Sequence, residues 1–329
     1  MGRALAFSDP DMIRLASEDY VPVVGDDWYQ RRRNDAEGEF FRKVSDQGPR
    51  KNTDGNTRQG IYCLTASGKM LAYKNAQDPE VMKDVLRRGL AAWKRLPVEE
   101  RAPGAVKVED LGKTDARFTR PPPEGGLIVT VHTRILEDND RGWWKHGTCD
   151  FPGGDRSARD HLWLTKDDWQ SLIPMEPKLD GVYPVPGRVA RRIARQHLVD
   201  NTRGEPTFWK VEQVRKLEMN VTVVEVTEKN ILLRLDGTAL LATDANVTQS
   251  SRGYSATLVG EIRYDRAKKA IDRFDVVAIG NHWGDGLYTG GSRPGRTPLG
   301  VAFELSRGDK PGDRVPPQAA RDWGDYLGR

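Results

Sequence analysis

Alternating apolar and polar residues dominate the second half of the chain, and this alternation predicts β-strands. Within residues 127–136, the apolar side chains Leu127, Val129, Val131 and Ile135 alternate with polar ones, as on a strand with one buried face. The same pattern recurs further along, between segments rich in turn residues. The expected strands cover 127–136, 217–223, 231–235, 239–242, 254–265, 270–280 and 299–305.

Two helical segments interrupt this β pattern. Thr165 is followed three residues later by Asp168, which is the spacing of a capping box at a helix start. A second helix is expected over 188–199, where apolar residues recur at helical spacing. We therefore expect 125–329 to form a mainly antiparallel β domain with a helical insertion, and we recognise no family for it.

The first hundred residues mix shorter elements. Valines at 21, 23 and 24 predict a buried strand at Tyr20–Gly25, and a β-hairpin is expected from strands 61–65 and 70–74. Helices are expected near residue 10, within 35–47 and from Asp78 to about residue 96. The order is therefore helix, strand, helix, β-hairpin, helix.

This order, together with two local motifs, resembles the thioredoxin-like superfamily. The run Tyr20-Val-Pro-Val with Trp28 shortly after it resembles the entry to such domains, and Gly60-Ile-Tyr-Cys-Leu-Thr-Ala-Ser-Gly-Lys-Met-Leu resembles their strand, turn and strand. The resemblance covers about residues 5–97. It implies an N-terminal α/β domain over 1–98.

The resemblance also implies a degenerate redox site. In members that exchange disulfides, a Trp is followed at once by Cys-x-x-Cys, and aligned on Trp28 those two positions fall on Tyr29 and Arg32. Disulfide exchange requires a thiolate that attacks sulfur, which neither side chain can provide. Cys63 lies in an expected hairpin strand, and we interpret it as a packing residue.

Length and composition complete the domain organisation. The chain has 329 residues, which suits two domains, and the proline-rich segment 99–124 is expected to link them. The expected fold class is thus α+β: a thioredoxin-like α/β domain, a linker and a larger β-rich domain.

Charge and hydropathy narrow the function classes. The 52 basic side chains nearly balance the 48 acidic ones, for a net charge of +4, which argues against a dedicated nucleic-acid binder. No apolar run reaches the ~18–20 residues of a membrane helix. If Met1 is the natural start, we expect the protein to be cytoplasmic. An upstream start would leave an extracytoplasmic location open.

One group of reactive side chains lies within 143–161. His146 and Cys149 are spaced like metal ligands, and His161 or His132 could supply a third ligand, so a transition-metal or thiol site is one hypothesis. No other cofactor is predicted.

A second group lies within 280–296, where glycines alternate with aromatic residues, as in a loop that rims a ligand pocket. Its candidate binding residues are His282, Trp283, Tyr288 and Arg293, joined by Trp143 and Trp144 from the first group.

Two functional hypotheses follow. In the first, the chain is a non-redox thioredoxin-like protein whose β-rich domain binds a ligand or a partner protein. In the second, it is an enzyme with a metal or thiol site built on His146, Cys149 and His161. Whether activity requires a metal ion or a thiol separates them.

Overall fold

The computed structural model describes residues 7, 9–51, 56–76, 78–107, 111–138, 144–146 and 157–327, without the side chains of 138 and 144–146. It is a mixture of helix and strand that divides into two compact units, one ending at Arg120 and the other beginning at Pro121. We call them the N-terminal unit and the β-rich unit, and describe each by itself.

The N-terminal unit packs helices against a two-stranded antiparallel sheet, β1 (Ile61–Leu64) with β2 (Met70–Lys74). Its helices are α1 (Pro10–Asp19), α2 (Asp27–Gln30), α3 (Ala36–Ser45), α4 (Pro79–Lys94) and α5 (Val98–Arg101). The apolar stripe of α4 faces the hairpin and α1, as its spacing predicts. The core consists of Met12, Cys63, Ala72, Met82, Val85 and Leu86.

The expected buried strand at Tyr20–Gly25 is wrong. The segment is extended but belongs to no strand, and Val21, Val23 and Val24 are 89%, 86% and 97% exposed. Pro22 has no N–H for a strand ladder, and no described strand of this unit pairs with the segment. The three valines therefore predicted the extended backbone of this segment, but not its exposure to solvent.

The expected linker is also partly structured. Its first residues form α5, and Asp115 accepts hydrogen bonds from the backbone N–H of Asn34 at 3.0 Å and of Arg117 at 3.1 Å. The ring of Phe118 packs edge-on against Trp28, with ring centres 5.9 Å apart. Residues up to 120 therefore belong to the N-terminal unit, and the boundary falls just before the triple proline.

The β-rich unit is built on a large antiparallel sheet in the order β4-β3-β11-β10-β9-β8-β7-β6, with β5 also paired to β3. Its strands are β3 (Leu127–Asp138), β4 (Trp144–His146), β5 (Ala158–Leu164), β6 (Val182–Pro184), β7 (Val214–Val226), β8 (Asn230–Ala242), β9 (Gly253–Asp265), β10 (Ala270–Trp283) and β11 (Thr297–Leu305). Strands β7 to β11 follow one another by hairpin connections, and the first strand, β3, pairs with the last, β11. The predicted β-rich class is confirmed.

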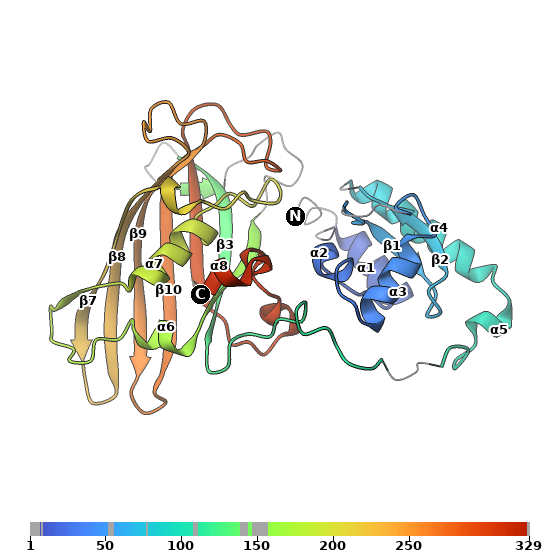
Figure 1. Ribbon diagram of the computed structural model, residues 1–329, viewed down its shortest axis with the longest axis horizontal. Helices are drawn as coiled ribbons and strands as arrows, with labels where there is room; N and C mark the ends of the chain where they lie inside the picture. The colour runs from blue at the N-terminus through green and yellow to red at the C-terminus, as the bar shows by residue number, and fades with distance from the viewer. Residues whose placement is uncertain are drawn as a thin grey trace. The chain divides into compact units, whose positions relative to one another are not determined.

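Helices cover one face of this sheet, which we call the inner face. They are α6 (Lys166–Gln170) and α7 (Gly187–Arg192), the latter continued by a π-helical turn at Ile193–His197. Figure 1 shows α7 lying across the long strands. The predicted capping box is present, because Thr165 and Asp168 each bond the other's backbone N–H. The core between helices and sheet includes Val189, Ile193, Trp209, Leu233, Phe274 and Val301.

The C-terminal segment contacts the free edge of β5. It contains short 3₁₀ turns at Pro311–Arg314 and Gln318–Arg321, followed by α8 (Trp323–Leu327). Elsewhere in the unit, a further 3₁₀ turn at Val211–Gln213 precedes β7. The Tyr326 hydroxyl accepts the backbone N–H of Trp163 at 2.9 Å, so this segment satisfies one donor on the free edge of β5.

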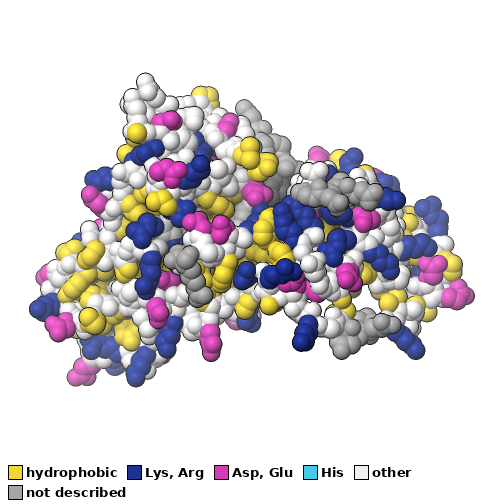
Figure 2. Space-filling view, viewed as in Figure 1, with side chains coloured by type: hydrophobic (Ala, Val, Ile, Leu, Met, Phe, Trp, Pro, Cys, Tyr) yellow, Lys and Arg dark blue, Asp and Glu magenta, His cyan; other side chains and the backbone are white. Residues whose placement is uncertain are grey.

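The outer face of the sheet is polar and charge-balanced. Arg234 pairs with Asp236 and Arg263 with Asp272, each at 2.8 Å. Acidic and basic side chains are interspersed on the visible surface of both units (Figure 2). None of the described helices is both long and apolar enough to cross a membrane.

Candidate functional site

A buried polar cluster lies at one end of the apolar inner face. The π-helical turn leads into Asp200, Asn201, Thr202 and Arg203, each at most 6% exposed. Such turns occur frequently at functional sites. Four successive polar residues in a protein interior carry a large desolvation cost, so their partners decide what the cluster does.

Asp200 and Arg203 form the centre of this cluster. Arg203 Nε donates to Asp200 Oδ2 at 2.6 Å, and Asp200 Oδ1 accepts both the N–H and the hydroxyl of Thr202. Arg203 Nη1 also donates to Asp285 Oδ1 at 2.6 Å and to the Thr289 carbonyl at 2.7 Å. Burial alone would raise the pKa of Asp200, but the positive charges and hydrogen bonds around it lower that pKa.

His282 comes from the inner face of β10 and reaches the same cluster. Its ring is 6% exposed and lies edge-on to Tyr254 of β9, with ring centres 6.1 Å apart. Burial lowers the pKa of His282 to about 4, against the opposing charge of Asp200. The imidazole is therefore neutral near pH 7 and can both donate and accept a hydrogen bond.

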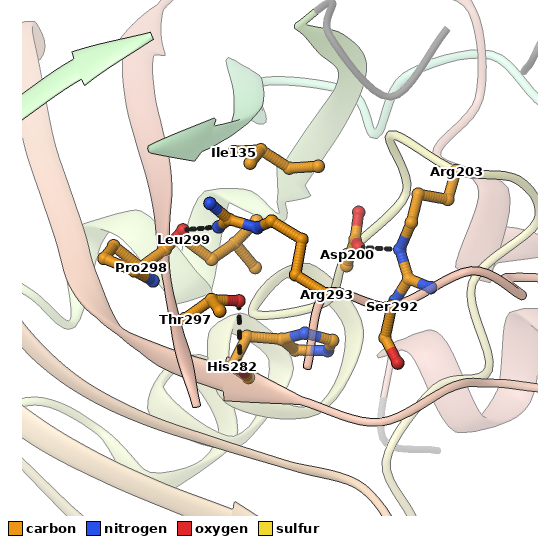
Figure 3. Close-up of a pocket in the computed structure, with 9 residues that line it drawn as sticks. All are labelled: Ile135, Asp200, Arg203, His282, Ser292, Arg293, Thr297, Pro298 and Leu299. Carbon is orange, nitrogen blue, oxygen red and sulfur yellow. Dashed lines mark hydrogen bonds and ion pairs between the residues drawn. The ribbon is translucent and has the colours of Figure 1, made fainter. Parts of the chain in front are cut away.

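The side chains of this cluster line a small cavity (Figure 3). Its lining residues are Ile135, Asp200, Arg203, His282, Ser292, Arg293, Thr297, Pro298 and Leu299. The cavity measures about 10 Å³, just enough for roughly one water molecule. Within the described chain, no hydrogen bond joins a ring nitrogen of His282 to another residue, so the imidazole is available to whatever occupies the cavity.

The loop after β10, residues 284–296, forms one wall of the cavity. Arg293 anchors it by donating to the carbonyls of Leu136 at 3.0 Å and Pro298 at 2.8 Å. Gly284 begins the loop with φ of +78°, and a Cβ there would lie 1.9 Å from the Ser251 carbonyl oxygen, so only glycine fits. The wall is thus held by a few polar anchors and lacks an apolar core.

The structure separates the candidate binding residues of this loop into two groups. His282 and Arg293 line the cavity together, as the ligand-pocket hypothesis requires. Trp283 is buried elsewhere: its Nε1 donates to the Ser250 carbonyl at 2.9 Å and Arg296 stacks on its ring at 4.1 Å. Tyr288 is 65% exposed at the loop tip, away from the cavity lining.

The first group of candidates is only partly described. Trp143 and Cys149 lie outside the described residues; Trp144 and His146 lie on β4, whose side chains are likewise outside the description. His161 lies on β5, 5% exposed, and burial lowers its pKa. Among the described residues no group of three His, Cys, Asp or Glu could hold a metal ion.

The sheet register places His146 and His161 apart. His146 pairs with Leu136 of β3, whereas His161 pairs with Thr130, six residues earlier on the same strand. Six strand residues span roughly 20 Å, much more than the separation of two ligands of one metal ion. The β-ladder therefore does not bring these two histidines together.

The redox-aligned positions of the N-terminal unit have structural contacts. Tyr29 is buried, and Arg32 lies over the Trp28 ring at 4.4 Å while donating to the Trp28 carbonyl at 3.1 Å. Cys63 is 2% exposed, and burial raises the pKa of its thiol. A buried thiol with a raised pKa is a poor nucleophile, as the packing interpretation expects.

The sequence reasoning missed Asp200, Arg203 and Arg252. A signal was present in Asp200-Asn-Thr-Arg203, because two opposite charges directly follow a helix with an apolar face. Charge pairs of this kind are common on surfaces, however, and only the fold shows that this one is enclosed. Comparison of the chain with protein-family models, curated proteins and solved structures finds no match.

Proposed function

We propose that the β-rich unit binds a small polar molecule in the Asp200–His282 pocket, and that the N-terminal unit is a non-redox, thioredoxin-like module. The observation that carries the first part is the neutral His282 ring, which faces a polar cavity and has no hydrogen-bond partner among the described residues. Buried polar groups are normally hydrogen-bonded, so an imidazole of this kind suits a ligand contact.

The pocket chemistry favours a ligand with both donor and acceptor groups. Neutral His282 provides one of each, and the Thr297 hydroxyl and the Ser292 hydroxyl lie on the cavity wall. Asp200 and Arg203 neutralise each other, and the other charged side chain of the lining is the guanidinium of Arg293, which donates to the carbonyls of Leu136 and Pro298. The ligand contacts are therefore hydrogen bonds in a pocket that also has one cation on its wall.

The size of the cavity implies movement on binding. A space for one water is too small for a metabolite, so the ligand displaces part of the loop 284–296. This loop is the movable wall, since its glycines permit backbone rotation and its tip, at Leu287 and Tyr288, is exposed. The anchors formed by Arg293 are the contacts that break when the wall opens.

The proposal for the N-terminal unit rests on its element order and on its missing thiols. The helix α3, the β-hairpin and the long amphipathic helix α4 follow one another as the resemblance implies, whereas the strand expected at Tyr20–Gly25 is not among the described strands. Tyr29 and Arg32 occupy the positions aligned with the redox cysteines, and the one cysteine of this unit, Cys63, is buried. The unit would thus act as a structural or partner-binding module.

A thermal-shift experiment on the full chain tests the pocket. The probes are glycerol, glucose, acetate and inorganic phosphate at constant ionic strength, with wild type, His282→Phe and, as a matched control, His132→Phe. His132 is a half-buried histidine whose neighbours in β3, Val131 and Thr133, are the buried ones. We expect at least one probe to raise the melting temperature of wild type and His132→Phe by several degrees, and not that of His282→Phe. Equal shifts in all three proteins would contradict the proposal.

A further inference from the structure

Arg252 is a buried cation next to the pocket. It directly precedes β9 and is 7% exposed. Its guanidinium stacks on the Trp209 ring at 3.9 Å, and Nη1 donates to the Thr207 carbonyl at 2.6 Å. Its Nε and Nη2 make no hydrogen bond within the described chain.

The other buried arginines of the described chain all have carboxylate partners, and Arg252 has none. The pairs are Arg33 with Asp35, Arg58 with Asp46, Arg192 with Asp168 and Arg203 with Asp200. Buried charges in proteins are normally paired, because an unpaired one carries the whole desolvation cost. Four of these five arginines follow the rule, which makes the exception informative.

The charge of Arg252 persists at neutral pH. Burial lowers the pKa of its guanidinium to about 10, and no nearby carboxylate of the described chain opposes that effect. The side chain is therefore a cation held in a protein interior without a counter-charge. Its planar fork of donors matches the two oxygens of a carboxylate or a phosphate.

The surroundings of Arg252 connect it to the movable wall of the pocket. The Thr207 residue that accepts from Arg252 also accepts, through Oγ1, the backbone N–H of Leu287 at 2.9 Å in the loop 284–296. Arg252 is close enough to His282 for its charge to help lower the pKa of that imidazole. It does not line the cavity, so it forms a separate contact point beside it.

From these observations we infer that Arg252 is an oxyanion-binding residue, whose ligand supplies a carboxylate or phosphate group as the missing counter-charge. The anion would lie against Nε and Nη2, on the side of the guanidinium that Thr207 leaves open. This site stands independently of the cavity, because none of its contacts involves a cavity-lining side chain. Where one ligand occupies both the cavity and the Arg252 site, His282 and Arg252 bind different parts of that ligand.

The competing explanation is purely structural: Arg252 is held by its stack on Trp209 and its bond to Thr207. Cation–π stacking and one charge-assisted hydrogen bond could retain an arginine without any ligand. The two explanations differ in what removal of the charge does. A structural role predicts loss of stability in every buffer, whereas an anion-binding role predicts loss only of the stabilisation that the anion adds.

Thermal unfolding of the full chain separates them, with sodium acetate and sodium phosphate as probes against sodium chloride at equal ionic strength. The variants are Arg252→Met, which removes the charge, and Arg252→Lys, which keeps the charge but loses the planar set of guanidinium donors. Arg215→Met is the matched control, because within the described chain Arg215 also donates only to carbonyl groups, those of Ala242 and Thr243, at the same end of the sheet.

We expect acetate or phosphate to raise the melting temperature of wild type and Arg215→Met by several degrees. The shift should be at least halved in Arg252→Lys and absent in Arg252→Met, while Arg252→Met in chloride melts at or above the wild-type temperature. A response to acetate alone identifies a carboxylate site, and one to phosphate alone identifies a phosphate site.

Three results would overturn the inference. The anion shift could persist in Arg252→Met, it could be absent from wild type, or Arg252→Met could melt lower in chloride with its anion shift unchanged. The variant His282→Phe distinguishes failure of the Arg252 inference from failure of the proposed ligand pocket. Anion stabilisation that is retained in His282→Phe and lost in Arg252→Met supports Arg252 alone, whereas glycerol or glucose binding that depends on His282 supports the pocket alone.

Discussion

Arg203 donates to Asp200 at 2.6 Å, and both side chains are at most 4% exposed, so this pair is an ion pair inside the β-rich unit. Asp285 and two backbone carbonyls accept the remaining hydrogen bonds of Arg203. The pair connects the segment after the π-helical turn to the loop that walls the cavity. Its integrity therefore determines the shape of the candidate site.

Removal of either partner of this pair should destabilise the β-rich unit strongly. Arg203→Met leaves the buried Asp200 carboxylate without its counter-charge, which typically costs about 3–5 kcal/mol. Asp200→Asn leaves Arg203 paired with Asp285 alone and should cost less. The double variant should cost less than the sum, because neither charge remains. Urea unfolding followed by tryptophan fluorescence measures the three free energies of unfolding.

The exposed pair Arg234–Asp236 is the control for that cycle. Its side chains are 54% and 51% exposed, so the same substitutions there should cost no more than about 1 kcal/mol and show little coupling. A coupling energy for Arg203 and Asp200 as small as that of the surface pair would show that the buried pair does not organise the site.

Stability should fall as the pH drops from about 6.5 to 4, in part because of His282. Burial lowers the pKa of this imidazole to about 4, below the ~6.5 of an unfolded histidine. Between those values the unfolded state binds the proton and the folded state does not, so protonation favours unfolding. The contribution is on the order of 2–4 kcal/mol over this range.

The variant His282→Gln should remove that part of the pH dependence. Urea unfolding at pH 4.5 and pH 7 gives the slope for each protein, and His132→Gln, which changes a half-buried histidine, should alter the slope less. An NMR titration of the His282 ring protons provides a direct check. A midpoint near 6.5 would contradict the enclosed, neutral imidazole.

The large sheet could be predicted from the sequence because its strands have one buried and one solvated face. Side chains such as Val129 and Val131 alternate with polar ones, and the two faces of β3 follow that alternation. The two strands expected at 231–235 and 239–242 are a single strand, β8, in which Gly237 pairs with Met219 and Leu258. A Cβ there would lie 2.7 Å from the Glu218 carbonyl oxygen, so close packing against β7 explains the glycine.

The candidate site could be predicted only in part. His282 and Arg293 could be predicted from the sequence because a loop rich in glycine and aromatic residues is typical of a pocket rim. Arg203 and Arg252 could not be predicted, since an arginine looks the same in sequence whether it lies at the surface or against Trp209. Their roles depend on contacts between residues that are 82 apart in the chain, for Arg203 with Asp285, and 45 apart, for Arg252 with Thr207, which local patterns do not encode.

Cys63 should be unreactive in the folded protein. It packs against Gly89 of α4, where an added Cβ would lie 2.5 Å from the Cys63 Cβ, and burial raises its thiol pKa. In a Cys149→Ser background, we expect Ellman's reagent to label Cys63 at least about a hundredfold more slowly in buffer than in 6 M guanidinium. The same protein should not reduce insulin. Rapid labelling, or insulin reduction that Cys63→Ala abolishes, would show that the N-terminal unit has a redox thiol.

Asp160 should destabilise the β-rich unit at neutral pH. Its Oδ2 lies 3.9 Å from His197 Nδ1 in the interior, where burial lowers the pKa of His197 to about 3 and leaves the ring neutral. Burial raises the pKa of Asp160 to about 6, above the ~3.9 of an unfolded aspartate, so the folded state binds the proton more tightly. Stability from this group is present below about pH 4 and is lost as the pH rises to about 6.

The variant Asp160→Asn should therefore be more stable than wild type above pH 6, by on the order of 1–3 kcal/mol, and no more stable near pH 4. Asparagine retains an oxygen for the Gln318 N–H, which donates to Asp160 Oδ1 at 3.2 Å, and its amide can donate to the neutral His197 ring. Urea unfolding at pH 4, 6 and 8 measures the difference, with the exposed Asp236→Asn as control. A stability gain that is independent of pH would mean that packing, and not the buried charge, sets the cost of Asp160.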